Sequence, residues 1–165
     1  MADVEFGPER ILGVLAADGV RSILIGGFAA VIHGSPYVTI DVDVVPAADD
    51  ANLHRLSDAL TEMHARVWTA AEPKGVPFDH SAASLTDARV WNLVTDHGRL
   101  DIMFEPAGTT GYEDLARDAV RLTILGIDVD VASLADVIRS KEAAAREKDR
   151  LVLPVLRRIA EAAEG

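Results

Sequence analysis

Two aspartates separated by one residue form the most informative pattern in the sequence. Asp41 and Asp43 alternate with apolar residues in the segment 40–45. Because alternate side chains of a strand point to the same face, both carboxylates are expected on one side and the apolar side chains in the core. Adjacent carboxylates repel each other when both are ionised, so the pair requires a cation or a shared proton. Mg²⁺ or Mn²⁺, which prefer oxygen ligands, suit such a pair.

A second segment carries one aspartate in the same alternation. Asp101 lies between Leu100 and Ile102, which are expected to face the core. If this strand neighbours the segment 40–45, three carboxylates converge. Such a set can hold two Mg²⁺ ions about 3.5–4 Å apart, the spacing used for in-line phosphoryl transfer.

Glycines precede the aspartate pair at two points of the chain. Gly26 and Gly27 lie between an expected strand and an expected helix, where bare backbone N–H groups can face a phosphate chain. Gly34 and Ser35 add a second flexible point with a hydroxyl group. A triphosphate between these donors and the metal ions is held at both ends.

Each of these features also has a plain structural explanation. A glycine pair commonly forms a tight turn, and a single aspartate on a strand is commonly a solvated edge residue. Two aspartates separated by one residue occur by chance and also mark glycosyltransferases that use nucleotide sugars. From spacing alone, a metal site and these other roles remain open alternatives.

In combination, the segments resemble the signature of the DNA-polymerase-β-like nucleotidyltransferase superfamily. In that signature a glycine pair is followed by a spacer and then by two acids one residue apart. Here the spacer between Gly27 and Asp41 has thirteen residues. Leu100-Asp101-Ile102 resembles the third acidic strand of the superfamily.

The segment 25–43 is similar to a narrower group, the bacterial AbiEii-type nucleotidyltransferase toxins of abortive-infection and toxin–antitoxin systems. His33 and Gly34 belong to that pattern, as does Thr39 two residues before the first acid. Tyr37 departs from it, because many relatives carry an arginine there that neutralises phosphate charge.

The run from Lys141 to Asp149 resembles the Lys-x-x-Ala-x-Arg-x-x-Asp helix motif of the same group. Lys141 follows Val137 and Ile138 by helical steps of three or four residues, which places it at the core-facing edge of its helix. If that helix continues, Asp149 lies about two turns further on the same face and can pair with a nearby cation.

The resemblance implies an α+β fold, the mixed β-sheet nucleotidyltransferase fold flanked by helices, with a helical C-terminal end and a single domain over residues 1–165. It implies Mg²⁺ or Mn²⁺ and a nucleoside triphosphate, with ATP as the expected donor. A nucleoside monophosphate would move to an acceptor hydroxyl of RNA such as tRNA, of a protein, or of a small molecule. A toxin of this kind would have an antitoxin protein as its partner.

The resemblance also assigns roles to residues of this chain. The first two acids are metal ligands, and Asp101 is both a metal ligand and a candidate base. The expected site comprises catalytic and metal-binding Asp41, Asp43 and Asp101, nucleotide-binding Gly26, Gly27, Ser35 and Lys141, and supporting Thr39 and Asp149. Tyr37 leaves a second function open, a non-catalytic nucleotide- or protein-binding module that kept the fold. A glycosyltransferase is a distant third, because no long nucleotide-sugar domain fits in 165 residues.

Charge and composition exclude several classes of protein. The net charge of −11 argues against a general duplex-DNA binder and weakly against an RNA acceptor, because phosphate contacts need lysine and arginine. A basic run near the C-terminus, taken alone, is interpreted as a solvated helix face. The chain has no cysteine, which excludes disulfides and thiolate zinc sites, and its five histidines lack metal-ligand spacing.

The hydropathy pattern predicts a soluble, cytoplasmic chain with no membrane partner. Apolar residues make up 49% of the sequence, which is enough for one core. No run approaches the roughly 18–20 apolar residues that span a bilayer. The acidic segment 1–5 lacks the features of a signal peptide.

Periodicity and turn residues predict one α+β domain. Helices are expected over 8–17, 28–32 and 49–65, from Leu134 with Ser133 as its cap, and in a final stretch to about residue 163. Pro154 must lie near the start of that last helix or kink it. Strands are expected at 22–25, 40–45, 89–95 and 99–104, with a hairpin turn at Asp96-His97-Gly98, and over 120–131 with a bend at Gly126. Residues 70–88 are expected to be loop.

Overall fold

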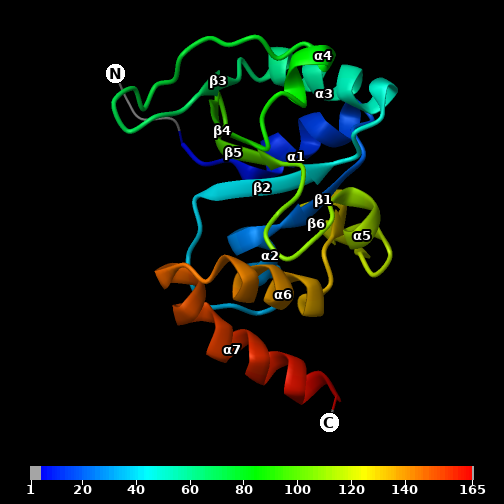
Figure 1. Ribbon diagram of the computed structural model, residues 1–165, viewed down its shortest axis with the longest axis vertical. Helices are drawn as coiled ribbons and strands as arrows, with labels where there is room; N and C mark the ends of the chain where they lie inside the picture. The colour runs from blue at the N-terminus through cyan, green and yellow to red at the C-terminus, as the bar shows by residue number, and fades with distance from the viewer. Residues whose placement is uncertain (1–4, 165) are drawn as a thin grey trace.

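The computed structural model describes residues 5–164, and these residues form a seven-stranded mixed sheet flanked by helices (Figure 1). The strands lie in the order β3-β4-β5-β2-β1-β7-β6. Their bounds are β1 Ser22–Ile25, β2 Asp41–Pro46, β3 Arg66–Val67, β4 Val90–Thr95, β5 Gly98–Met103, β6 Val120–Ile124 and β7 Ile127–Val131. The predicted α+β class and mixed sheet are confirmed.

The helices lie on two sides of this sheet. Their bounds are α1 Pro8–Ala17, α2 Gly26–Ile32, α3 Asp50–Glu62, α4 Ala82–Leu85, α5 Tyr112–Ala116, α6 Leu134–Ala144 and α7 Glu147–Glu164. In Figure 1, α1, α3 and α4 lie on one side of β2, and α2, α6 and α7 lie on the other. The C-terminal end is helical, as predicted.

Pairing in the centre of the sheet decides which side chains meet. β2 pairs in parallel with β5 and antiparallel with β1, and β1 pairs in parallel with β7. The apolar side chains of these strands are buried, including Leu24, Val42, Leu100 and Ile102. The alternate residues of β2 and β5 are therefore left to face a cavity.

Both predicted hairpins form with two-residue turns. Thr95 pairs with Gly98 across Asp96-His97, and Ile124 pairs with Ile127. Gly98 has a φ of +113° and lies so close to Phe6 that an added Cβ would be 2.9 Å from its ring. Only glycine tolerates both conditions.

Three segments differ from the prediction. The helix predicted over 49–65 ends at Glu62, because His64 has a φ of +51° and the N–H of Ala65 turns back to the carbonyl of Leu60. The predicted loop 70–88 contains α4 and a bridge between Val67 and Val76. Helix α5 was not predicted, because its five residues are too few to show a helical period.

Pro154 lies inside α7 rather than near its start. A proline in a helix removes the hydrogen bond to the residue four positions earlier, here Arg150. Both residues are exposed, so water can satisfy the free carbonyl.

The acidic start considered above lies mostly in residues 1–4, outside the described residues. No helix within residues 5–164 has the length and apolar character that crossing a membrane requires.

Candidate active site

The parallel pairing of β2 with β5 brings the three predicted aspartates together. Asp43 and Asp101 are register partners, and Asp41 lies two residues earlier on the same face of β2. All three line one cavity of about 640 Å³, within the size range of small-molecule sites. The expectation that strand 99–104 neighbours strand 40–45 is confirmed.

Mutual repulsion and burial disturb the ionisation of these carboxyl groups. Burial raises the pKa of Asp43 to about 7, and the charge of Asp101 and a hydrogen bond with it act in the same direction. Burial also raises the pKa of Asp101, as does the negative charge of Asp41. Near neutral pH the Asp43–Asp101 pair therefore shares a proton, as expected when two carboxylates approach without a cation.

The donor set fits a hard divalent cation by its chemistry. The Oδ1 atom of Asp41 is buried and accepts no hydrogen bond among the described residues. Across residues 5–164, no group of three or more His, Cys, Asp or Glu side chains is already arranged to hold a metal ion. The carboxylate oxygens of these aspartates are nevertheless the type of ligand that Mg²⁺ and Mn²⁺ prefer.

Arg99 supports the carboxylate of Asp101 from the same strand. Its Nη2 lies 3.4 Å from Asp101 Oδ1, and its Nε donates to the carbonyl of Leu93 at 3.1 Å. The guanidinium also lies over the ring of Trp68, 4.0 Å from its centroid. These contacts restrict where Asp101 can point, and Trp68 thereby acquires a role that the sequence did not predict.

The two glycines that begin α2, directly after β1, form a turn that approaches Asp43 closely. Gly26 has a φ of +75°, and a Cβ at this position would overlap with Asp43 Oδ2 and lie 2.8 Å from its Cγ. A Cβ at Gly27 would lie 3.1 Å from Thr39 Oγ1. Both glycines line the cavity. Glycine is required at Gly26 by conformation and by space together.

The irregular segment between α2 and β2 forms another part of the cavity wall. Ser35 is buried, and its Oγ accepts a hydrogen bond of 3.2 Å from the backbone N–H of Tyr37. Thr39 Oγ1 lies 3.4 Å from both the N and the O of Asp41. Ser35, Tyr37 and Thr39 all line the cavity, so the structure places them with the aspartates.

Lys141 reaches the same cavity from α6, but not by the route predicted. The helix does not continue to Asp149: α6 ends at Ala144, and Ala145 adopts a left-handed conformation with φ +51°. Lys141 Nζ nevertheless lies 3.5 Å from Asp149 Oδ1 across this break. Burial lowers the pKa of Lys141, while the charge of Asp149 opposes that change.

Asp149 holds the start of α7 together. It accepts hydrogen bonds from the backbone N–H of Arg146 at 3.1 Å and from its Nε at 2.8 Å. This bond from the third residue of a helix back to the cap is half of a capping box. Burial alone would raise the pKa of Asp149, but the bonds from Arg146 outweigh it and lower the pKa.

Among the cavity residues that were not predicted as site residues, three lie close to the expected acids or cation: Arg146, Lys148 and Asn92. Arg146 and Lys148 line the cavity, although the basic run that contains them was interpreted as a solvated helix face. The charge of Lys148 acts on Asp43 and lowers its pKa. Asn92 is the register partner of Asp101 on β4. The sequence predicted a hairpin here, but with Gly98 in the turn; because Gly98 instead pairs with Thr95, Asn92 lies opposite Asp101.

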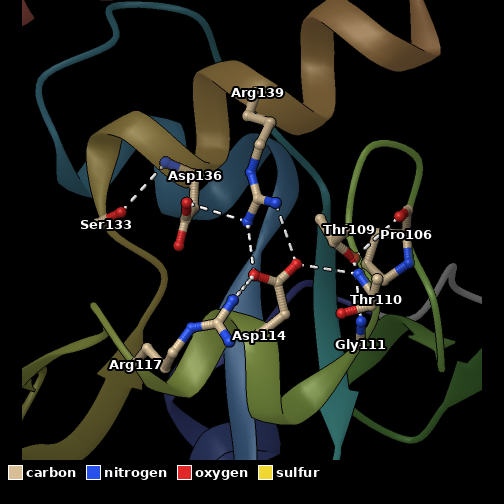
Figure 2. A network of polar contacts seen from close by, with 9 residues as sticks. All are labelled: Pro106, Thr109, Thr110, Gly111, Asp114, Arg117, Ser133, Asp136 and Arg139. Atoms are coloured by element: carbon tan, nitrogen blue, oxygen red, sulfur yellow. Dashed lines mark hydrogen bonds and ion pairs between the residues drawn. The ribbon is translucent and has the colours of Figure 1, made fainter.

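A network of ion pairs anchors the segment after β5 to α6 (Figure 2). Buried Asp114 on α5 accepts bonds from Arg139 Nη1 at 3.0 Å, Arg117 Nη2 at 2.7 Å and the N–H of Thr110 at 2.9 Å. The bonds from Arg139 lower the pKa of Asp114 to about 2. Arg139 is two residues from Lys141, so this network also positions the helix that carries the cavity lysine.

Solved structures confirm that this is the nucleotidyltransferase fold. The lincosamide antibiotic adenylyltransferase LnuA, bound to lincomycin, is similar with a TM-score of 0.62 and 13% identity, over 95% of this chain and 99% of that chain. TM1012 from Thermotoga maritima, provisionally assigned as a nucleotidyltransferase, is similar with a TM-score of 0.52 and 15% identity, over 94% of this chain and 91% of that chain. No protein-family model and no curated protein matches the sequence. At these identities the likeness concerns the fold, and the AbiEii-type resemblance stays a prediction.

Proposed function

We propose that this chain is a nucleotidyltransferase that moves a nucleoside monophosphate from a nucleoside triphosphate to an acceptor hydroxyl, with Mg²⁺ or Mn²⁺ as its cofactor and ATP as its donor. One observation carries the proposal. Asp43 and Asp101 are register partners beside Asp41, in a cavity that also contains a glycine turn and three cations. The likeness to an adenylyltransferase supports it at the level of the fold.

Different residues of the chain would bind the reacting phosphoryl group and the leaving pyrophosphate of the donor. Asp41, Asp43 and Asp101 would hold the metal, which when bound neutralises the triphosphate and polarises the reacting phosphoryl group. Lys141, with Arg146 and Lys148 nearby, offsets the negative charge of the leaving pyrophosphate. These cations replace the arginine that Tyr37 does not provide.

The transfer step balances without an added reactant. The acceptor oxygen attacks the α-phosphorus, the bond from that phosphorus to the bridging oxygen of the β-phosphate breaks, and pyrophosphate leaves. Asp101 takes the proton of the acceptor hydroxyl.

A labelling assay tests the proposal. The protein is incubated with MgCl₂ and ATP labelled in the α- or the γ-phosphate, together with a bacterial small-molecule extract, tRNA or total protein as acceptor. Transfer predicts that the α-label enters an acceptor and the γ-label appears as pyrophosphate. Asp41→Asn protein is the control. An α-label that never leaves the nucleotide pool would contradict the proposal.

The alternative, a non-catalytic nucleotide- or protein-binding module, is favoured by Tyr37 in the cavity wall and by the proton-sharing arrangement of the acids. It predicts that a non-hydrolysable ATP analogue binds, as measured by calorimetry, while no α-label is transferred to any acceptor.

A toxin role with an antitoxin partner extends the proposal and rests on the resemblance of segments 25–43 and 141–149. It predicts that induced expression of the wild-type chain arrests bacterial growth and that Asp41→Asn does not. Equal growth of both strains at equal protein levels would remove the toxin role and leave the transferase proposal standing.

A further inference from the structure

The walls of the cavity differ in charge. All of its lysine and arginine side chains, Lys141, Arg146 and Lys148, come from α6 and the start of α7. The wall formed by β4, β5 and the segment after β5 contributes Val90, Met103 and Glu105 and no cation among its cavity-lining residues. Figure 1 shows β4 and β5 on one side of β2 and α6 and α7 on the other, whereas the segment after β5 reaches α6, to which the Asp114–Arg139 ion pair joins it.

The cation-free wall adjoins Asp101, the candidate base. Asn92 pairs with Asp101 across β4 and β5, and Val90 pairs with Met103 two residues further along the same face. An acceptor hydroxyl that gives its proton to Asp101 can therefore lie against Asn92, with the rest of the acceptor over Val90 and Met103. Glu105 adds a negative charge at the end of this surface.

The mouth of the cavity gathers exposed apolar side chains. Eight large apolar residues are exposed in the described part of the chain, and five of them line this cavity: Tyr37, Val38, Ile40, Val90 and Leu151. A concentration of this kind on a polar, acidic protein marks a binding surface rather than random exposure.

From these observations we infer that the acceptor is a neutral or positively charged small organic molecule with a hydroxyl group and an apolar face. The inference rests on the proposed function and gives its substrate class. A nucleic acid needs cations along its backbone. None of the residues with which this wall lines the cavity is a lysine or an arginine, and Arg99 of β5 is engaged with Asp101 and the carbonyl of Leu93. The net charge of −11 further attracts cations and repels anions.

Three phenols whose side chains carry a positive charge, no charge or a negative charge test the inference. Tyramine is cationic, N-acetyltyramine is neutral and 4-hydroxyphenylacetate is anionic. Each is titrated by ligand-observed NMR at about 0.15 M salt, with and without a non-hydrolysable ATP analogue and MgCl₂. Tyramine and N-acetyltyramine are expected to bind at least about fivefold more tightly than the anion, the scale of one nearby charge in an exposed site. Equal binding of all three, or displacement of tyramine by a short single-stranded RNA, would overturn the inference.

Two variants locate the binding to this wall. Glu105→Lys is expected to reverse the charge preference, so that 4-hydroxyphenylacetate binds more tightly than tyramine. Val90→Asp is expected to weaken the binding of N-acetyltyramine. Val120→Asp is the matched control, since Val120 also begins a strand and is 42% exposed, against 46% for Val90, but does not line the cavity. Unchanged probe binding in both cavity variants would also overturn the inference. Binding of the ATP analogue alone is measured separately by calorimetry. If the analogue does not bind, that result contradicts the proposed function and not the inferred class of acceptor.

Discussion

Asp43 on β2 and Asp101 on β5 are register partners of two parallel strands, and their carboxyl groups are close enough to share a proton. The cost of holding two acids together is thus built into the fold. A binding site for a cation tolerates this unfavourable free energy, because the cation replaces the proton. The effect of the aspartates can therefore be measured in thermal stability as well as in activity.

The first prediction concerns stability against pH. The pKa of Asp43 is raised from 3.8 to about 7. Between pH 3.8 and about 7 the folded protein therefore binds a proton at Asp43 that the unfolded chain does not. The contribution of Asp43 to the free energy of unfolding is highest below pH 4 and is lost as the pH rises through about 7. Without divalent cations, wild-type protein should lose melting temperature between pH 5 and pH 8. Asp43→Asn should flatten this slope. At pH 8 the variant should melt higher by at least about 2–4 °C, which corresponds to about 1 kcal/mol in a protein of this size.

A second prediction separates the role of the acids from their structural cost. Asp41→Asn should abolish α-label transfer, since it removes a metal ligand, and should leave the circular dichroism spectrum unchanged. The Oδ1 atom of Asp41 has no hydrogen-bond partner to lose among the described residues. Unfolding of this variant would show that the aspartate is structural.

A third prediction concerns the lysine of α6 that lines the cavity, and it uses the substitution Lys141→Met. Loss of one charge-assisted contact should weaken binding of the ATP analogue about tenfold or more. Stability should change little, because Asp149 keeps its bonds from Arg146. Lys74→Met is the matched control, since Lys74 is exposed and lies outside the cavity lining. Equal calorimetric affinity in both variants would leave Lys141 with only its structural ion pair to Asp149.

Two glycine-to-alanine substitutions separate the effect of a positive φ from the effect of steric overlap with Asp43. Gly26 and Gly126 both have positive φ values, +75° and +85°, but only a Cβ at Gly26 would collide with Asp43, whereas Gly126 has open space. Gly126→Ala should destabilise by about 1 kcal/mol, the cost of a left-handed conformation. Gly26→Ala should destabilise more and also abolish binding of the ATP analogue, because Asp43 must move. Equal effects in thermal melts and calorimetry would remove the steric argument.

The ion-pair network after β5 predicts an effect at a distance from the acids. Asp114→Asn should lower the free energy of unfolding by on the order of 2 kcal/mol, because two arginines lose a charged acceptor. The pKa of Asp114 is lowered to about 2, so this contribution is present above about pH 4 and disappears as pH falls toward 2. Asp118→Asn, at an exposed position four residues on, is the control for urea unfolding. Equal midpoints for the two variants at pH 7 would contradict the assignment.

The sequence by itself determined the local part of the site. The alternation around Asp41, Asp43 and Asp101 predicted which face of each strand carries acid, because the strand period is two and needs only neighbouring residues. The hairpin between the strands that carry Asn92 and Asp101 was likewise predicted, but with Gly98 in the turn; the pairing of Asn92 with Asp101 follows from the shorter turn that the structure shows. The resemblance of the motifs to the nucleotidyltransferase superfamily predicted the mixed-sheet fold.

Only the tertiary structure decided which distant segments meet. Parallel pairing of β2 with β5 joins strands separated by more than fifty residues, and no local period encodes that choice. The left-handed Ala145 redirects the chain so that Lys141 and Asp149 meet across a break between two helices, whereas the sequence related them only on the condition that one helix continued. The same turn moves Arg146 and Lys148 from an apparently solvated face to the cavity. Such contacts depend on how whole elements pack, which is decided by burial of the shared core rather than by the residues that finally touch.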